Sequence, residues 1–469
     1  MKERVMTAVN KKERMMHLIL LFSLLLFFVL MFILYGPGVY NDSDQYIKMH
    51  IHREPLYPLF LKLLRDFFGE SFLYPMGIIQ NVFMAIAIYL LTRTIGDRFK
   101  LPVSMEALVA CIQVFPHIMT KYFSAMSVFV TNSVMSEALA FPLFTLWTMN
   151  ALKLLWKGEK KHIAGTLIFS LLLSLTRGQM MVAILVFMLI MLCRVISEPQ
   201  GRRKLLRILG VVAVMAALFV ARTYAVKCYN LVYNGRFINN TYGNVNLVTN
   251  MIYASDREDG EAIREEQTRE FFYEIFDKAW AIEGNYSFSG DSLMDRADHI
   301  EQMHDEIKFN CIEDTFYQYY DKNVTTDYIT QNLLADEQAM GMMKAIFPKC
   351  FKNWLVTYCG IVYYGLVRSI AVVHPLINIA AVGIYLLAIV LTVLLWKRNP
   401  KSPAVPMMCL ALLFIAGNTT AVALTIMCLS RYMIYGFALF YLSGLMVVTE
   451  LIREWHCAKI NKTCTRKEE

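Results

Sequence analysis

The sequence HLILLFSLLLFFVLMFILY at residues 17–35 decides the fold class. It is almost entirely apolar and long enough to cross a hydrocarbon core of roughly 30 Å. It exceeds the apolar core of a secretory signal peptide, about 7–15 residues, and no small-residue cleavage site follows it, so we expect a retained membrane helix. Similar runs recur through the 469 residues, of which 57% are hydrophobic. The sequence therefore predicts an all-α polytopic membrane protein with about ten transmembrane helices.

The predicted spans follow the apolar runs. They lie at about 17–36, 76–95, 103–120, 135–153, 162–177, 179–197, 206–225, 375–396, 403–427 and 432–452. Lysine and arginine gather in segments that all fall on one side of the membrane in this topology: 2–14, 93–100, 157–161, 202–207, 397–401 and 453–467. The positive-inside rule therefore predicts a multi-pass plasma-membrane protein whose N- and C-termini are both cytoplasmic.

Charge divides the chain into five predicted parts. Residues 256–321 hold 19 acidic and 6 basic side chains, a net charge of −13, in a chain of formal net charge +8. The first part is a membrane module of seven spans at 1–225, with its first outer loop at 37–75. An acidic, mostly helical extracytoplasmic domain follows at 226–345, and then an outer interfacial helix at 346–374. The chain ends with three spans at 375–452 and a basic cytoplasmic tail at 453–469. The basic residues are dispersed at span ends, a pattern that suits anionic membrane lipid and argues against nucleic acid as a partner.

Two segments of the outer part have specific patterns. REDGEAIREEQTREFFYEIFDKAW at 257–280 predicts one amphipathic helix, with an apolar stripe of Ile263, Phe271, Phe272, Ile275 and Phe276. The second segment is KAIFPKCFKNWLVTYCGIVYYGLVRSIAVVHP at 344–375, which is apolar. If it crossed the membrane, the later basic loops would lie on the outer side, so we expect a helix that lies at the outer interface. Cysteines at 228, 311, 350 and 359 would lie outside the membrane, where the sequence leaves a disulfide open.

Polar side chains interrupt the apolar pattern on the predicted outer face. NDSDQYIKMHIHREPLYP at 41–58 places Asp42 and Asp44 just beyond the first span. The outer ends of later spans hold Glu137, Arg177, Arg431 and Tyr432. Taken singly, such an arginine is typical of an interfacial anchor, and a glutamate at a helix start is favoured by the helix dipole. Taken together, carboxylates that can accept a proton and guanidinium groups that match phosphate oxygens indicate a reactive site.

These residues carry a resemblance to a known class. Asp42 and Tyr46 in DSDQY, the element REPLYPLFLKLL at 53–64, Ser136-Glu137, the LTR sequence ending at Arg177 and Arg431-Tyr432 occur in that order along the chain. Their order and sidedness resemble the GT-C class of membrane glycosyltransferases, which includes protein O-mannosyltransferases and the lipid A aminoarabinose transferase. The resemblance covers roughly 15–225 and 345–450. It departs at the second acid, which is often adjacent to the first in that class and here follows two residues later.

The resemblance implies an enzyme that moves a sugar from a polyprenyl-phosphate carrier to an extracytoplasmic acceptor (a cell-surface glycan, lipid or protein) by inverting displacement. Asp42 or Asp44, in the loop at 37–75, is expected to be the catalytic base. Positive charge should stabilise the leaving phosphate, with Arg53, Arg177, Arg431 and Lys227 as candidates. The full set of predicted substrate-binding residues is Tyr46, His52, Arg53, Tyr57, Glu137, Arg177, Lys227, Arg431 and Tyr432.

The expected site contains no cofactor and no metal. Asp42-Ser43-Asp44 has the form of a metal-binding DxD pair, so a divalent ion is the less favoured alternative. His50 and His52 are interpreted as loop residues or acceptor contacts. Rival functions are a polysaccharide polymerase or ligase of the outer leaflet, a lipid-linked-sugar transporter, and a sensor whose outer domain is the functional part. No internal repeat of the kind found in transporters is evident.

Overall fold

The computed structural model describes residues 2–40, 42–122, 127–197, 203–371 and 375–468. Arg202 of one predicted basic segment, the end of the predicted interfacial helix at 372–374 and the terminal residue 469 lie outside this range. The described residues form helices and no strand beyond one isolated bridge between Gly38 and Ser133. The all-α fold class is confirmed.

The helices of the membrane part are α1 (Lys2–Tyr35), α2 (Ser43–Ile47), α3 (Leu56–Phe68), α4 (Leu73–Phe99), α5 (Val103–Tyr122), α6 (Ser136–Lys157), α7 (Lys160–Thr176), α8 (Met181–Ser197), α9 (Arg203–Asn234), α15 (Pro375–Arg398), α16 (Ala404–Thr425), α17 (Ser430–Met433) and α18 (Tyr435–Glu468). The remaining helices are α10 (Gly243–Ala254), α11 (Glu266–Ala281), α12 (Leu293–Glu306), a π-helical turn (Ile307–Glu313), α13 (Asp314–Asn323) and α14 (Tyr328–Ile370).

Within the described ranges, nine helical segments are long and apolar enough to cross a membrane. They correspond to nine of the ten predicted spans, and the remaining prediction at 162–177 coincides with α7. At 17 residues α7 is about 26 Å long, the lower limit for a span. Large apolar side chains point outward, with Phe22, Leu206 and Leu386 all more than half exposed, as expected of surfaces that face lipid rather than water. The chain is a multi-pass membrane protein.

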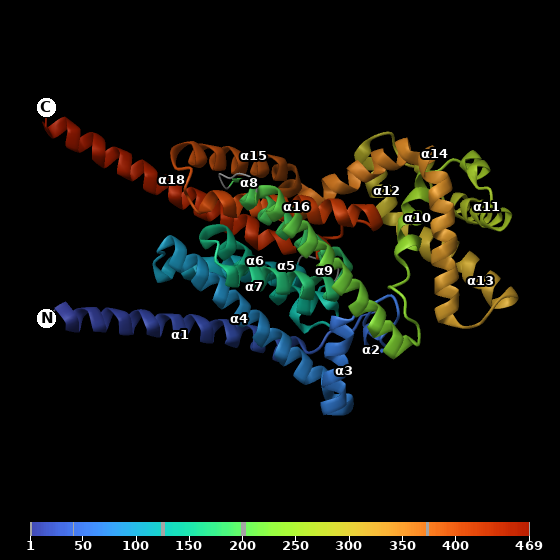
Figure 1. The fold of residues 1–469 in the computed structure, drawn as a ribbon, viewed down its shortest axis with the longest axis horizontal. Helices are drawn as coiled ribbons and strands as arrows, with labels where there is room; N and C mark the ends of the chain where they lie inside the picture. The colour runs from blue at the N-terminus through green and yellow to red at the C-terminus, as the bar shows by residue number, and fades with distance from the viewer. Residues whose placement is uncertain (1, 41, 123–126, 198–202, 372–374, 469) are drawn as a thin grey trace.

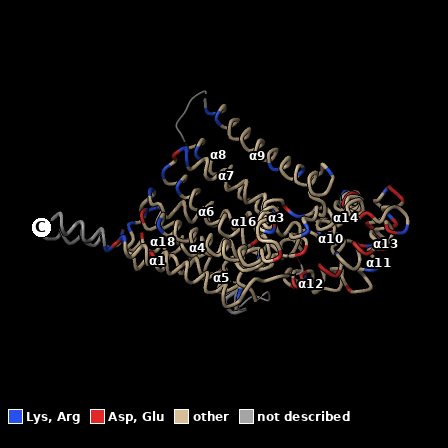
Figure 2. The backbone as a smooth tube through the Cα atoms, turned by 90° about the horizontal axis from the view of Figure 1, so that it is seen from below, with Lys and Arg blue, Asp and Glu red and all other residues tan. Residues whose placement is uncertain are grey.

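The helices α10–α13 and the N-terminal half of α14 form a separate helical lobe. Figure 1 shows the lobe at one end of the molecule and, at the other, the N-terminal end of α1 and the C-terminal end of α18. Basic residues are frequent at the end of the bundle where α18 leaves it, and acidic residues are frequent over α11–α13 (Figure 2). This separation of charge is the one that the sequence predicts for cytoplasmic and outer surfaces.

Two predicted boundaries fall inside continuous helices. The boundary at 225/226 lies within α9, and the boundary at 345/346 lies within α14. The predicted interfacial helix is therefore the second half of a 43-residue helix whose first half packs in the lobe, and α14 is not among the nine candidate spans. The predicted helix at 257–280 is also shorter: a 3₁₀ turn with a capping box occupies Arg257–Ala262, and α11 begins at Glu266.

The lobe has its own apolar core, which continues into the membrane part. Phe272, Ile275 and Phe316 are fully buried at its centre, so the predicted apolar stripe of α11 does face a core. The same cluster includes Cys428 and Met433 from the segment between α16 and α18. The lobe is thus anchored to the end of the bundle that holds residues 426–433. Cys311 and Cys350, candidates for a disulfide, are buried free thiols.

The loop after α1 is tied to the segment that precedes α6. Gly36, with φ of +66°, ends α1, and Pro37 follows it. The amide of Gly38 donates to the carbonyl of Asn132 at 2.9 Å, and the amide of Val134 donates to the carbonyl of Gly38 at 2.8 Å. These contacts bring residues 42–46 next to the start of α6.

Candidate functional site

A cavity of about 920 Å³ lies between the end of the membrane bundle and the helical lobe. Its wall is contributed by the loop after α1, the start of α6, the turn between α7 and α8, the connection from α9 to α10, the π-helical turn and residues 426–432. Seven of the predicted site residues line it: Asp42, Tyr46, His52, Arg53, Arg177, Arg431 and Tyr432. Residues far apart in the sequence therefore meet in one space, which is large enough for a small-molecule ligand.

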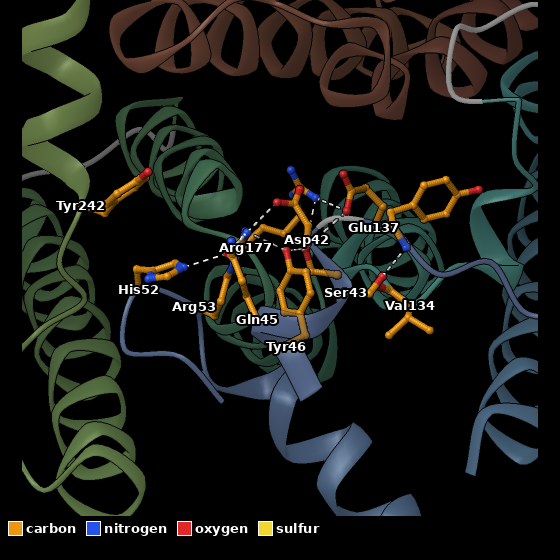
Figure 3. Close-up of polar contacts among 12 residues, drawn as sticks. Asp42, Ser43, Gln45, Tyr46, His52, Arg53, Val134, Glu137, Arg177 and Tyr242 are labelled. Atoms are coloured by element: carbon orange, nitrogen blue, oxygen red, sulfur yellow. Dashed lines mark hydrogen bonds and ion pairs between the residues drawn. The ribbon is translucent and has the colours of Figure 1, made fainter. Parts of the chain in front are cut away.

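Asp42 lies in the cavity, where Figure 3 shows it beside Arg53. Its Oδ1 accepts a hydrogen bond from Arg53 Nη2 at 2.8 Å, and its Oδ2 is 3.7 Å from Arg431 Nη1. Burial would raise the pKa of the Asp42 carboxyl, but the positive charges of Arg53 and Arg431 outweigh it, and the pKa is lowered. Asp42 is therefore a carboxylate at neutral pH.

Arg177 and Glu137 form a buried ion pair behind Asp42. Glu137 begins α6, and Arg177 follows directly after α7, in an extended conformation that ends that helix. Arg177 Nη1 also donates to Ser136 Oγ at 3.1 Å, and Ser136 Oγ is 3.0 Å from the hydroxyl of Tyr46. The pair thus joins the first outer loop to α6 and α7.

One donor of the buried Arg177 guanidinium is left unsatisfied. Its Nε–H is buried and has no hydrogen-bond acceptor among the described residues. Its Nη2 donates to Gln179 at 3.2 Å, and its positive charge lies 5.2 Å from the centre of the Tyr432 ring. A buried donor without an acceptor costs about 1–3 kcal/mol.

Arg431 and Tyr432 reach the cavity from the short helix α17. Arg431 Nη2 donates to the Tyr432 hydroxyl at 2.6 Å, and its guanidinium lies 4.7 Å from the centre of that ring. The Tyr432 carbonyl accepts from Asn418 Nδ2 at 2.9 Å and from Gln179 Nε2 at 3.2 Å. These bonds fix the segment 426–433 against α16 and the start of α8, so the two side chains have a rigid support.

Gln45 organises the outer edge of the first loop. Its Oε1 accepts from Arg53 Nε at 2.8 Å and lies 2.8 Å from His52 Nε2 (Figure 3). Because an amide oxygen can only accept, the neutral His52 ring carries its proton on Nε2. On its other side, His52 stacks on Tyr242 at the start of α10, with ring centres 5.3 Å apart. The loop and the lobe are connected through this stack.

His52 is expected to make the free energy of unfolding depend on pH. Burial, with the positive charges of Arg53 and the neighbouring histidine, lowers the pKa of His52 to about 3. Between this value and the ordinary value of about 6.5, the unfolded chain binds a proton that the folded chain does not, so stability falls as pH falls through this window.

In detergent-solubilised protein, His52→Gln should reduce the loss of stability between pH 6.5 and 4. His456→Gln, at an exposed site, should leave the loss as it is. An unchanged slope in His52→Gln would contradict a buried, neutral His52.

Four predicted site residues do not line the cavity. Asp44 is largely exposed and pairs with Lys48 at 2.7 Å. Tyr57 is fully buried below Tyr46, where its hydroxyl donates to Gln80 and to the Ser133 carbonyl, which makes it part of the support. Lys227 lies over the ring of Phe237. Glu137 contacts the cavity only through Arg177.

Other cavity residues were not predicted from the sequence. Glu54, paired with Arg222 of α9, lines the cavity, and burial raises the pKa of its carboxyl to about 7 despite that partner. Tyr242 and Glu313, hydrogen-bonded to one another, and Lys308 enter from the lobe. Glu54 lies within the quoted stretch 41–58, so its position was a usable signal. The lobe residues carry no pattern that distinguishes them from the surrounding charged surface.

Within the described part of the chain, no three histidine, cysteine or carboxylate side chains gather as a set of metal ligands. The site is instead a set of arginines, carboxylates and aromatic rings. Comparison with known proteins adds no name to it, because no family model, curated protein or solved structure matches this chain.

Proposed function

We propose that this protein is a membrane glycosyltransferase that moves a sugar from a polyprenyl-phosphate carrier to an extracytoplasmic acceptor. The observation that carries the proposal is the meeting of Asp42, Arg177 and Arg431 in one cavity at the end of a membrane bundle. A lipid-linked donor needs a site that touches both the membrane helices and an aqueous space. The positive-inside pattern supports an extracytoplasmic position for this end of the bundle.

The residues suit direct displacement at the anomeric carbon. The acceptor oxygen forms a bond to that carbon while the bond from carbon to the phosphate oxygen breaks. The electron pair of the broken bond leaves with the polyprenyl phosphate, and the acceptor proton passes to the Asp42 carboxylate. A leaving phosphate needs positive charge rather than a proton, and Arg177 and Arg431 supply it. One displacement inverts the anomeric configuration.

A second observation favours transfer over transport. Polar side chains inside the bundle, among them Gln113, His117 and Thr148, surround a cavity of only about 30 Å³, close to the volume of one water molecule. A sugar does not fit there, whereas the cavity at the lobe holds about 920 Å³. The large polar space lies at one end of the bundle and not at its centre, where transporters bind their substrates.

Transfer of radiolabelled sugar tests the proposal. In proteoliposomes supplied with a panel of polyprenyl-phosphate sugars, the wild type should pass label to an acceptor or to water, and EDTA should leave the rate unchanged. Arg431→Gln should lower the rate about 10²-fold, because the leaving phosphate loses a positive charge. Arg257→Gln, an exposed arginine of the lobe that pairs with Asp277, is the matched control and should keep the wild-type rate.

Two outcomes would contradict this function. A wild-type rate in Arg431→Gln would remove the phosphate role of that arginine. Labelled lipid that crosses the bilayer without any transfer, for every donor in the panel, would favour the transporter alternative.

A further inference from the structure

Lys308 is a buried cation that the proposed reaction does not use. It belongs to the π-helical turn Ile307–Glu313 of the lobe, its residue is only 6% exposed, and it lines the same cavity as Asp42 and Arg431. Short π-helical segments are rare and occur frequently at functional sites. A buried lysine is costly unless an opposite charge or a ligand compensates it.

The immediate surroundings of Lys308 are aromatic. Its ammonium nitrogen lies 4.3 Å from the centre of the Tyr242 ring and 4.6 Å from that of Phe309. Across the described ranges, no carboxylate lies within ion-pairing distance of this nitrogen. Two acids that line the same cavity have other partners: Glu313 accepts from the Tyr242 hydroxyl, and Asp305 lies 3.1 Å from His304 Nδ1. The cation–π contacts hold the ammonium group in place without neutralising it.

Lys308 is also separate from the arginines that suit the leaving phosphate. Arg177 follows the end of α7 and Arg431 belongs to α17, just before α18, near where a polyprenyl chain would enter the bilayer. Lys308 is on the wall contributed by the lobe, and Tyr242 and His52 lie between it and Gln45. A ligand that fills the cavity from Arg177 to Lys308 would therefore meet positive charge at both ends.

We infer that Lys308 binds a second anionic group, a carboxylate or phosphate carried by the acceptor. This inference rests on the proposed function, because it assigns the donor phosphate to Arg177 and Arg431 and leaves Lys308 to the molecule that approaches from the lobe. The acceptor is then an acidic or phosphorylated molecule and not a neutral one.

Binding of sugar phosphates to the full-length protein in nanodiscs tests the second anion position directly. The probes are glucose 1-phosphate and glucose 1,6-bisphosphate, and the readout is the ratio of their dissociation constants. The bisphosphate should bind wild type at least tenfold more tightly. Lys308→Met should abolish that ratio, and Lys308→Arg should retain most of it. Lys322→Met, at an exposed lysine of α13, is the matched control and should behave as wild type. A ratio of one in wild type, or the same ratio in Lys308→Met, would overturn the inference.

Transfer kinetics then separate acceptor from donor. With one neutral donor sugar, Lys308→Met should raise KM about tenfold for an acidic acceptor and leave KM for its neutral analogue unchanged. If Lys308→Met instead raised KM whenever the donor sugar is acidic, with either acceptor, the assignment of the anion to the acceptor would be overturned. If the protein prefers the bisphosphate through Lys308 but transfers no sugar, the proposed function is rejected and the anion-binding role of Lys308 is kept. If the protein transfers sugar but shows no preference for the bisphosphate, the proposed function is kept and the anion-binding role of Lys308 is rejected.

Discussion

Asp42→Asn is expected to lower the rate of sugar transfer by about 10²–10⁴-fold, the usual contribution of a general base. The carboxylate of Asp42 is held in the cavity by Arg53 and is kept ionised by the surrounding arginines. An amide at this position can still accept the hydrogen bond from Arg53, so the loop should keep its structure, but it cannot take the proton of the acceptor. The measurement is transfer of label from the polyprenyl-phosphate sugar, with donor binding determined on the same preparation.

Asp44→Asn is the matched control for this prediction. Its carboxylate is 58% exposed and pairs with Lys48 outside the cavity, so the variant should transfer sugar at nearly the wild-type rate. The reverse result, an active Asp42→Asn and an inactive Asp44→Asn, would move the base to Asp44. Activity in both variants would reject a carboxylate base in this loop.

The geometry of α2 explains why the sequence left these two aspartates undecided. Asp42 is the N-cap of α2, a helix of five residues, and successive residues of a helix are about 100° apart. Asp44, two positions on, therefore points to nearly the opposite side, whereas Tyr46, four positions on, shares the side of Asp42. Without the limits of α2, the spacing DxD is compatible with either residue in the site.

Hydropathy predicted most of the membrane fold because the requirement that it reflects is local. Each span must by itself supply a long apolar surface, so runs such as 17–35 are visible in the sequence. Helix limits were less predictable. The predicted boundaries at 225/226 and 345/346 fall inside α9 and α14, because each helix continues through its boundary without a change that composition reveals.

The candidate site was predictable where polarity conflicted with its surroundings. Arg177 and Arg431 are charged residues at the ends of apolar runs, and the structure brings both to Asp42. Lys308 could not be recognised in this way, since it lies among many charged residues and only the tertiary packing of the lobe buries it. Tyr57 and Lys227 do not line the cavity, for a related reason: a sequence gives the position of a side chain along a helix more readily than the direction in which it points.

Glu137→Gln is expected to lower the free energy of unfolding by about 3–5 kcal/mol, because it leaves a buried guanidinium without its counter-charge. The Arg177 side chain is 12% exposed and that of Glu137 is 4% exposed, and the pair joins α6 to the turn after α7. The free energy can be measured by titration of micelle-bound protein with a denaturing detergent. The double variant Glu137→Gln/Arg177→Gln should recover part of the loss, since it removes the buried charge altogether.

Lys48→Met is the control that separates burial from pairing as such. It breaks the pair with Asp44, in which both side chains are more than half exposed, and such pairs contribute roughly 0–1 kcal/mol. If Glu137→Gln cost no more than Lys48→Met, water would have to reach Arg177, and the guanidinium would be free to change its orientation in the cavity. A loss of several kcal/mol that the double variant partly restores would instead mean that Glu137 fixes Arg177 in place before any substrate binds.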